Sequence, residues 1–237
     1  MRDFQIILQA RANSTRLPGK VLKDLRGKPM LKWQIESLKK LQIPTVVATT
    51  SNSQDDAIEE LATSLGLLCV RGPEHNVYER FRLATRLFPA NNYIRLTGDC
   101  PLISPKVTQR LIELHTNSGA DYSSNFLIRS FPDGLDVEAF SQQAFNKLGG
   151  MTLTEYQKEH VTPGFYQNPE IFNIINLLEE RNLGDWRWTI DFESDFTWLE
   201  GMLKAMKATE APEYEDIMNF VNDNPTFMRT QKDAKLF

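Results

Sequence analysis

The sequence has only two cysteines and three histidines among its 237 residues. Cys69 and Cys100 fit neither a disulfide framework nor a zinc-binding spacing, which excludes a disulfide-stapled domain and a zinc finger. No apolar run approaches the roughly 18 residues that span a bilayer, and no signal peptide precedes the first apolar segment. We therefore expect a cytoplasmic protein without a membrane partner.

Two common nucleotide-binding loops are also missing. A P-loop needs glycine five residues before its Gly-Lys pair and Ser or Thr after it. Around Gly19-Lys20, these positions hold Ser14 and Val21. The pattern G-x-G-x-x-G does not occur, so a Rossmann dinucleotide site has no support.

Acidic and basic residues are unevenly distributed. The formal net charge is −4, yet residues 1–40 carry ten Lys and Arg against three Asp and Glu. A nucleic-acid surface would need an extended basic band, and apolar strand residues interrupt these charges. The distribution predicts a small anionic ligand and no nucleic-acid partner.

The densest group of cations follows the first apolar strand, predicted at residues 4–10. The loop after it carries Arg11, Arg16 and Lys20. Arginine offers planar paired donors to phosphate oxygens, and lysine offers a compact charge. Pro18 and Gly19 allow a rigid, sharp bend just before the lysine. Because ligands bind at the carboxyl ends of parallel strands, we expect a polyphosphate here.

Strand and helix patterns alternate along the first half of the chain, which indicates a mostly parallel α/β sheet flanked by helices. Strands are predicted at 4–10, 45–50, 67–70 and 93–97, and helices at 29–41, 55–65, 77–88 and 105–117. Later strands are predicted at 124–130, 135–140, 172–177 and 186–190, and helices at 141–148, 154–160, 196–207 and 214–222. We expect one domain over residues 1–237, with 124–170 as an inserted acceptor or dimer region and helices in 196–237.

Two aspartates each follow a predicted strand. Asp99 ends the strand at 93–97, and Asp191 ends the one at 186–190. Mg²⁺ needs one or two carboxylates together with substrate phosphates, so both are candidate metal ligands. A lone aspartate in such a place can equally be a helix cap or turn residue. No histidine is placed to activate the neighbouring Cys100, so we do not expect a cysteine nucleophile.

Several blocks resemble the cytidylyltransferases that make CMP-activated sugars, above all the branch named after the spore coat polysaccharide protein SpsF. They are Ile-Leu-Gln-Ala-Arg at 7–11, Ser-Thr-Arg-Leu-Pro-Gly-Lys at 14–20, Arg-Gly-Lys-Pro-Met at 26–30, Val-Ala-Thr-Thr at 47–50, Arg-Leu-Thr-Gly-Asp-Cys-Pro-Leu-Ile at 95–103, Pro-Asp-Gly-Leu-Asp-Val-Glu at 132–138 and Glu-His-Val-Thr-Pro at 159–163. The resemblance covers most of the chain in the family's order.

This resemblance implies a GT-A-like nucleotidyltransferase fold, CTP as substrate, Mg²⁺ as cofactor and a homodimer. By position, the triphosphate would be held by Ala10, Arg11, Ser14, Arg16 and Lys20. Thr49, Ser51 and Arg71 would lie near the base and ribose, and Asp99 and Asp191 would hold the metal. Arg11, Arg16, Lys20 and Asp99 would carry the catalysis.

The implied reaction transfers CMP from CTP to a hydroxyl of a sugar or sugar acid and releases pyrophosphate. Asp133, Asp136, Glu138 and His160 are the candidate acceptor-binding residues. Asp136 and Glu138 alternate along a predicted strand and would share a face, although a solvated strand edge explains them equally well. Arg129 or Arg187 could grip an acceptor carboxylate.

Two other functions stay open. A GT-A glycosyltransferase that uses a nucleotide sugar would share the fold, but such enzymes commonly carry Asp-x-Asp where this chain has Asp99-Cys100-Pro101. A nucleotide-binding domain without turnover is the other alternative. The retention of Arg11 and Lys20 together with Asp99 favours the cytidylyltransferase.

Overall fold

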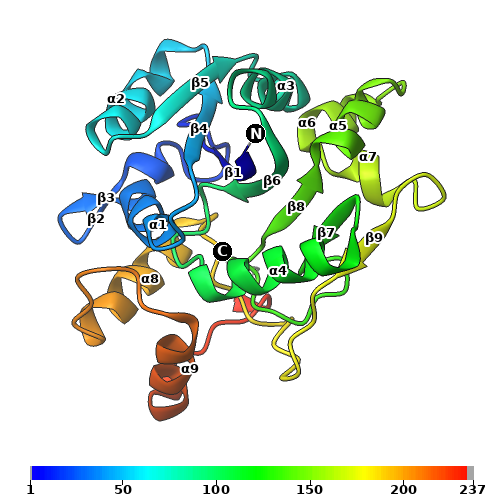
Figure 1. Cartoon of the computed structure of the whole chain (residues 1–237). Helices are drawn as coiled ribbons and strands as arrows, with labels where there is room; N and C mark the ends of the chain where they lie inside the picture. Colours follow the sequence, from blue (N-terminus) through cyan, green and yellow to red (C-terminus); the bar gives the residue numbers. More distant parts are fainter. Residues whose placement is uncertain (1, 234–237) are drawn as a thin grey trace.

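The computed structural model describes residues 2–233, and a seven-stranded sheet runs through them (Figure 1). The strand order is β5-β4-β1-β6-β8-β7-β9. The bounds are β1 Arg2–Gln9, β4 Thr45–Thr50, β5 Leu68–Gly72, β6 Ala90–Thr97, β7 Tyr122–Ser124, β8 Glu138–Ser141 and β9 Ile174–Asn176. The α/β fold with a mostly parallel sheet is confirmed.

The first four of these strands along the chain are parallel, since β1 pairs with both β4 and β6, and β4 pairs with β5. Parallel neighbours need crossover helices, and α1 (Met30–Lys39), α2 (Asp56–Ser64) and α3 (Val77–Leu87) supply them. Each predicted helix in this half exists within two residues of its predicted ends. All four strands therefore end at one edge of the sheet, where the loops after β1 and β6 meet.

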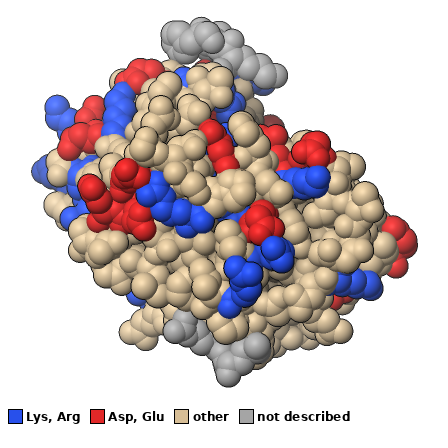
Figure 2. All heavy atoms as spheres, turned by 90° about the horizontal axis from the view of Figure 1, so that it is seen from above, with Lys and Arg blue, Asp and Glu red and all other residues tan. Residues whose placement is uncertain are grey.

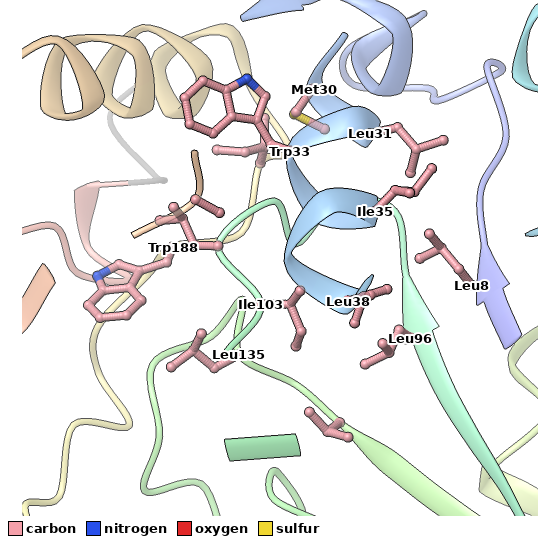
Figure 3. Packing of buried hydrophobic residues seen from close by; sticks show 14 of the residues in the cluster. Leu8, Met30, Leu31, Trp33, Ile35, Leu38, Leu96, Ile103, Leu135 and Trp188 are labelled. Atoms are coloured by element: carbon pink, nitrogen blue, oxygen red, sulfur yellow. The ribbon is translucent and has the colours of Figure 1, made fainter. Parts of the chain in front are cut away.

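Hydrophobic side chains from the two faces of the sheet form two cores. One face packs against α1, α2 and α4 (Pro105–Ser118). Figure 3 shows α1 turning Leu31 and Ile35 toward Leu8 of β1 and Leu96 of β6. The other face packs against α3 and α5 (Gln142–Gly149), which makes a three-layer α/β/α arrangement. Two cores of this size hold the loops at the sheet edge on a rigid base.

The second half of the sheet is mixed. β8 pairs antiparallel with β6 and β7, and β7 pairs parallel with β9. The strand predicted at 124–130 is wrong, because β7 stops at Ser124 and a turn follows. Asp136 precedes β8, so the expectation that it alternates with Glu138 along one strand is wrong as well. The role of 124–170 as an acceptor or dimer region stays a prediction.

The strand predicted at 186–190 is also wrong. Its residues make only the isolated bridges between Arg187 and Asp133 and between Trp186 and Thr230. The β-branched and aromatic pattern is real, and Trp188 is fully buried. The backbone amides of residues 188–190, however, donate to carbonyls of loops and not to a neighbouring strand. Ile190 N, for example, donates to Asp99 O at 2.9 Å. Residues 186–190 therefore form an extended segment that packs against loops at the sheet edge.

The remaining elements complete the layers. Short 3-10 helices are η1 (Lys20–Leu22), η2 (Ser53–Asp55) and η3 (Pro225–Phe227), and β2 (Asp24–Leu25) pairs with β3 (Lys28–Pro29). The other helices are α6 (Glu155–His160), α7 (Pro163–Tyr166), α8 (Glu193–Ala205) and α9 (Tyr214–Asp223). In the part of the chain that the structure describes, no helix has the length and apolar character to cross a membrane.

Candidate active site

The loop after β1 bends back under the sheet edge. Gly19 has φ of 72°, in the left-handed region that favours glycine, and its amide donates to Ala12 O at 2.8 Å. This bend starts η1 and turns Lys20 inward, so that Lys20 is only 6% exposed. The Pro-Gly turn predicted from the sequence therefore delivers one buried cation to the sheet edge.

Lys20 joins the two aspartates. Its Nζ lies 3.3 Å from Asp99 Oδ2 and 3.1 Å from Asp191 Oδ1, and it donates to Ile190 O at 2.6 Å. The loop and Asp99 thus face each other across one site, as the sequence predicted. Asp191 reaches the same point although the strand expected before it does not form.

Asp99 is held as an anion. Its Oδ1 accepts a hydrogen bond from Thr97 Oγ1 at 2.7 Å. Burial raises the pKa of Asp99, but the charge of Lys20 and the bond from Thr97 outweigh it and hold the pKa below its ordinary value. The carboxylate is therefore ionised and able to bind a cation at neutral pH.

Asp191 lies within a dense charged network. Arg16 Nη2 contacts Asp191 Oδ1 at 2.8 Å, and Arg187 Nη2 contacts Asp191 Oδ2 at 2.9 Å. Arg187 also contacts Asp195 Oδ2 at 3.1 Å, which fixes its orientation. Arg16 is 56% exposed in its side chain and lies over the Phe192 ring at 5.2 Å, whereas Arg187 is buried.

These groups line one cleft of about 290 Å³. It is lined by Gln9, Ala10, Arg11, Ser14, Thr15, Arg16, Lys20, Val21, Arg95, Thr97, Gly98, Asp99, His160 and Asp191. Five predicted triphosphate-binding residues and both predicted metal ligands are among them. On the face shown in Figure 2, positive and negative residues are intermingled, unlike the continuous basic band that a nucleic acid would need.

One residue that sequence reasoning missed organises the cleft. Asp55 is 2% exposed and accepts from Ala12 N at 2.7 Å and from Thr50 N at 3.1 Å, and also from Thr50 Oγ1. Burial raises its pKa, yet the bonds from Thr50 and Ala12 hold the pKa below its usual value. Asp55 therefore ties the cationic loop to the end of β4. From the sequence, Asp55 is only the first residue of the helix predicted at 55–65.

The predicted base and ribose residues lie beside the cleft, not on its lining. Thr49 is fully buried, Ser51 is exposed, and the Ser51 amide donates to Gly72 O at 2.9 Å. Arg71 contacts Asp56 at 2.7 Å and Glu59 at 3.0 Å. These three positions surround the end of β4, and their contact with a nucleotide stays a prediction.

The predicted acceptor residues separate into two groups. His160 lines the cleft, and buried Glu138 pairs with Arg95, which also lines it. Asp136 pairs in parallel with Arg129 at 2.9 Å on both oxygens, and Asp133 Oδ2 lies 3.4 Å from Arg187 Nη1. Asp133 and Asp136 are thus outside the cleft lining, and both arginines considered for an acceptor carboxylate are already paired.

Cys100 is buried beside Asp99. Burial and the neighbouring charge of Asp99 raise the pKa of its thiol well above the usual range. A thiol kept protonated is a poor nucleophile, which agrees with the sequence expectation.

Asp99 and Asp191 form a donor set that suits a hard cation. Within residues 2–233, no group of three or more His, Cys, Asp and Glu side chains is arranged to hold a metal ion. Mg²⁺ does not need such a cage, because it is bound by one or two carboxylates and by substrate phosphates. The ammonium of Lys20 lies between these two carboxylates.

Comparison with known proteins decides the family, because the sequence profile described as cytidylyltransferase matches residues 5–234. This chain belongs to the cytidylyltransferase family. A structure of a cytidylyltransferase from Leptospira borgpetersenii has a TM-score of 0.91 to it, with 30% identity over 98% of each chain. The predicted GT-A-like nucleotidyltransferase fold and the predicted enzyme class are confirmed.

Two curated relatives are similar to this chain over different shares of its length. Spore coat polysaccharide biosynthesis protein SpsF of Bacillus subtilis is 29% identical over 95% of this chain and 96% of its own. The 3-deoxy-manno-octulosonate cytidylyltransferase of Vibrio cholerae is 32% identical over 47% of this chain and 45% of its own. The resemblance to the SpsF branch, predicted from the motifs, is confirmed.

Proposed function

We propose that this cytidylyltransferase transfers CMP from CTP to a hydroxyl of a sugar or sugar acid in a Mg²⁺-dependent reaction that releases pyrophosphate. The observation that carries the proposal is the position of Lys20 between the Asp99 and Asp191 carboxylates, 3.3 Å and 3.1 Å away. A lysine, two carboxylates and an exposed arginine at one cleft suit phosphoryl transfer, which depends on positioning and charge neutralisation.

The cationic loop would hold the triphosphate. Arg11 and Arg16 are partly exposed, with 36% and 56% of their side chains accessible, so both can turn toward phosphate oxygens. Ala10 and Ser14 lie at the start of the loop and line the cleft. Their backbone and hydroxyl groups would bind oxygens between the two arginines. Thr49, Ser51 and Arg71 would flank the base and ribose.

Asp99 and Asp191 would hold Mg²⁺ together with the phosphates. The bound ion would supply charge neutralisation at the α-phosphate. Lys20 would then contact a phosphate oxygen instead of the two carboxylates, and Arg16 would leave Asp191 for the departing pyrophosphate. Thr97 would keep the Asp99 carboxylate oriented through its 2.7 Å hydrogen bond.

In the transfer itself, an acceptor hydroxyl oxygen would bond to the α-phosphorus while the bond from that phosphorus to the pyrophosphate oxygen breaks. The hydroxyl proton would leave to solvent, and the electron pair would leave with pyrophosphate. Arg11, Arg16 and Lys20 would stabilise the charge on this leaving group. No covalent enzyme intermediate is needed, which agrees with the protonated Cys100 thiol.

The acceptor would bind beside His160 and the Arg95–Glu138 pair, since His160 and Arg95 line the cleft and Glu138 contacts Arg95. The relatives named for spore coat polysaccharide and for 3-deoxy-manno-octulosonate support a surface-sugar acceptor. Asp133 and Asp136 would act behind them by fixing Arg187 and Arg129. We further propose a cytoplasmic homodimer as the working form.

Pyrophosphate release from CTP, UTP, ATP and GTP, measured with a panel of sugars and sugar acids, tests the proposal. Release with CTP and an acceptor, only in the presence of Mg²⁺, is the expected result. Release of a nucleoside diphosphate from a nucleotide sugar would instead support the glycosyltransferase alternative. Binding of CTP without turnover on any acceptor would support a nucleotide-binding domain.

A further inference from the structure

Glu74, in the loop after β5, joins three loops at the sheet edge. Its Oε1 accepts from Asn13 Nδ2 at 3.0 Å, in the cationic loop after β1. Its Oε2 accepts from Asn52 Nδ2 at 2.7 Å, in the segment after β4. The carbonyl of Asn52 accepts from Arg71 Nη2 at 2.7 Å. Glu74 therefore lies among the residues that we expect near the base and ribose.

Glu74 is also connected to the cleft. Its Oε1 lies 4.0 Å from Nη1 of Arg11, which lines the cleft. In the strand order, β4 and β5 are on one side of the contact between Lys20 and Asp99, and β8, which carries Glu138, is on the other. With the triphosphate at this contact and the acceptor beside β8, the nucleoside would extend toward the ends of β4 and β5, where Glu74 lies.

The carboxylate of Glu74 has capacity for a further hydrogen bond. The bonds from Asn13 and Asn52 hold its pKa below the ordinary value, so the group is ionised at neutral pH. Each of its oxygens accepts one of these bonds, whereas a carboxylate oxygen has lone pairs for two. An additional donor can therefore bind Glu74 without displacing either asparagine.

The other carboxylates at this end of the sheet are more fully engaged. Asp56 and Glu59 contact Arg71 at 2.7 Å and 3.0 Å. Asp55 accepts from two backbone amides and a hydroxyl. Of these four carboxylates, Glu74 is the one with no ion pair closer than 4.0 Å and no bond from a backbone amide among the described residues. A carboxylate also repels phosphate oxygens, so its place beside a triphosphate calls for a donor on another part of the nucleotide.

Cytosine offers such a donor. It carries an amino group at C4, where uracil carries an acceptor oxygen. A carboxylate accepts a hydrogen bond from the amino group and repels the oxygen. A cytidylyltransferase has to distinguish these two bases, and an ionised acceptor does so by attraction to one and by repulsion of the other.

We propose that Glu74 is a specificity-determining residue for the base: its carboxylate accepts from the 4-amino group of cytosine and repels O4 of uracil. Asn13 and Asn52 hold the carboxylate in place for this contact. The inference rests on the proposed function in taking CTP as the substrate. It has a consequence that a structural link between loops would not have, because discrimination between CTP and UTP should change while affinity for the triphosphate alone is kept.

The test compares Glu74→Gln with Glu79→Gln, in which a carboxylate of α3 that pairs with Arg82 is replaced in the same way. Calorimetry with Mg²⁺ measures binding of CTP, UTP, dCTP and inorganic tripolyphosphate to the whole chain. The glutamine amide has both a donor and an acceptor, so it tolerates either base. We expect the ratio of CTP affinity to UTP affinity to fall about tenfold or more in Glu74→Gln. Tripolyphosphate affinity should not fall, and Glu79→Gln should keep the wild-type ratio.

An equal fall in the affinities for CTP and UTP would show that Glu74 only links the loops, and would overturn the inference. A changed ratio of CTP affinity to dCTP affinity with an unchanged ratio for UTP would place Glu74 at the ribose and overturn it as well. If the wild type binds UTP as tightly as CTP, the proposed function and the inference both fail. If the wild type prefers CTP and Glu74→Gln keeps this preference, the inference alone fails.

Discussion

The ammonium of Lys20 lies 3.3 Å from the carboxylate of Asp99, although 79 residues separate them along the chain. The contact is possible because β1 and β6 are parallel neighbours whose carboxyl ends meet, with Gln9 paired to Thr97. Asp191 approaches from a third segment and contacts the same ammonium.

Replacing Lys20 by alanine should reduce CTP-dependent pyrophosphate release by about 100-fold or more, because a positioned cation at the transferring phosphates is lost. The far-ultraviolet circular dichroism spectrum should stay unchanged, since the two cores do not include this side chain. Lys39→Ala, on an exposed lysine of α1, is the matched control. Turnover at the wild-type rate in Lys20→Ala would remove the loop from the mechanism.

Changing Asp99 to asparagine should raise the Mg²⁺ concentration required for half-maximal activity by about tenfold or more, because one anionic ligand is lost. A magnesium titration of the rate of pyrophosphate release measures this shift, and chelation of Mg²⁺ with EDTA should abolish the wild-type rate. Asp216→Asn, on the exposed face of α9, should leave the titration unchanged. Equal magnesium curves for wild type and Asp99→Asn would exclude Asp99 as a ligand.

Asp55→Asn should weaken CTP binding and lower the free energy of unfolding by about 2 kcal/mol, because the amide replaces one of two accepting oxygens by a donor. The oxygens accept from Ala12 N at 2.7 Å and Thr50 N at 3.1 Å, so the cationic loop would lose its tie to β4. KM for CTP should rise more than kcat falls. Glu60→Gln, on an exposed side chain of α2, separates this effect from a general change of charge.

A site residue could be predicted from the sequence where it directly follows a clear strand, and not where tertiary contacts alone position it. Lys20 and Asp99 follow strands whose apolar runs are unmistakable, so their meeting could be predicted from the parallel pairing. For Asp191 the strand-end argument is wrong, because the segment before it binds loop carbonyls and forms no strand, so the resemblance is the sequence argument that remains. The role of Asp55 could not be predicted, because the hydrogen bonds that a buried carboxylate accepts are a tertiary property.

His115 should make stability depend on pH. It is 2% exposed, its ring binds Ser123 Oγ and Asn92 Oδ1, and burial lowers its pKa from 6.5 to about 4 despite attraction from Asp121. A lowered pKa means that the unfolded chain takes up the proton first as the pH falls. The contribution of neutral His115 to the free energy of unfolding is therefore complete above pH 6.5. It is lost between pH 6.5 and 4 and amounts to at most about 3 kcal/mol.

Urea unfolding of wild type and His115→Gln from pH 7.5 to pH 4 measures this loss. The free energy of unfolding of His115→Gln should change less with pH over this range than that of the wild type. His75→Gln, on an exposed histidine, should show the same pH dependence as the wild type. Parallel curves for wild type and His115→Gln would show that another group governs acid sensitivity.

Gly134→Ala should both destabilise the protein and impair the site. Gly134 has φ of +112°, and a Cβ there would lie 2.5 Å from Thr189 N and from Trp188 C. The backbone of residues 188–189, which leads to Asp191, would have to move away, because both neighbouring atoms are backbone atoms and not part of a flexible side chain.

We expect a loss of about 3 kcal/mol in the free energy of unfolding and a fall in activity beyond the fraction unfolded. Gly119→Ala is the matched control, because Gly119 also has a positive φ of +60° but no atom lies within 4 Å of the Cβ that alanine would add there. It should lose about 1 kcal/mol and keep full activity. If Gly134→Ala behaves like Gly119→Ala, the packing of Gly134 against residues 188–189 does not position Asp191. An effect of this turn on the contact between Asp191 and Lys20 would then be excluded.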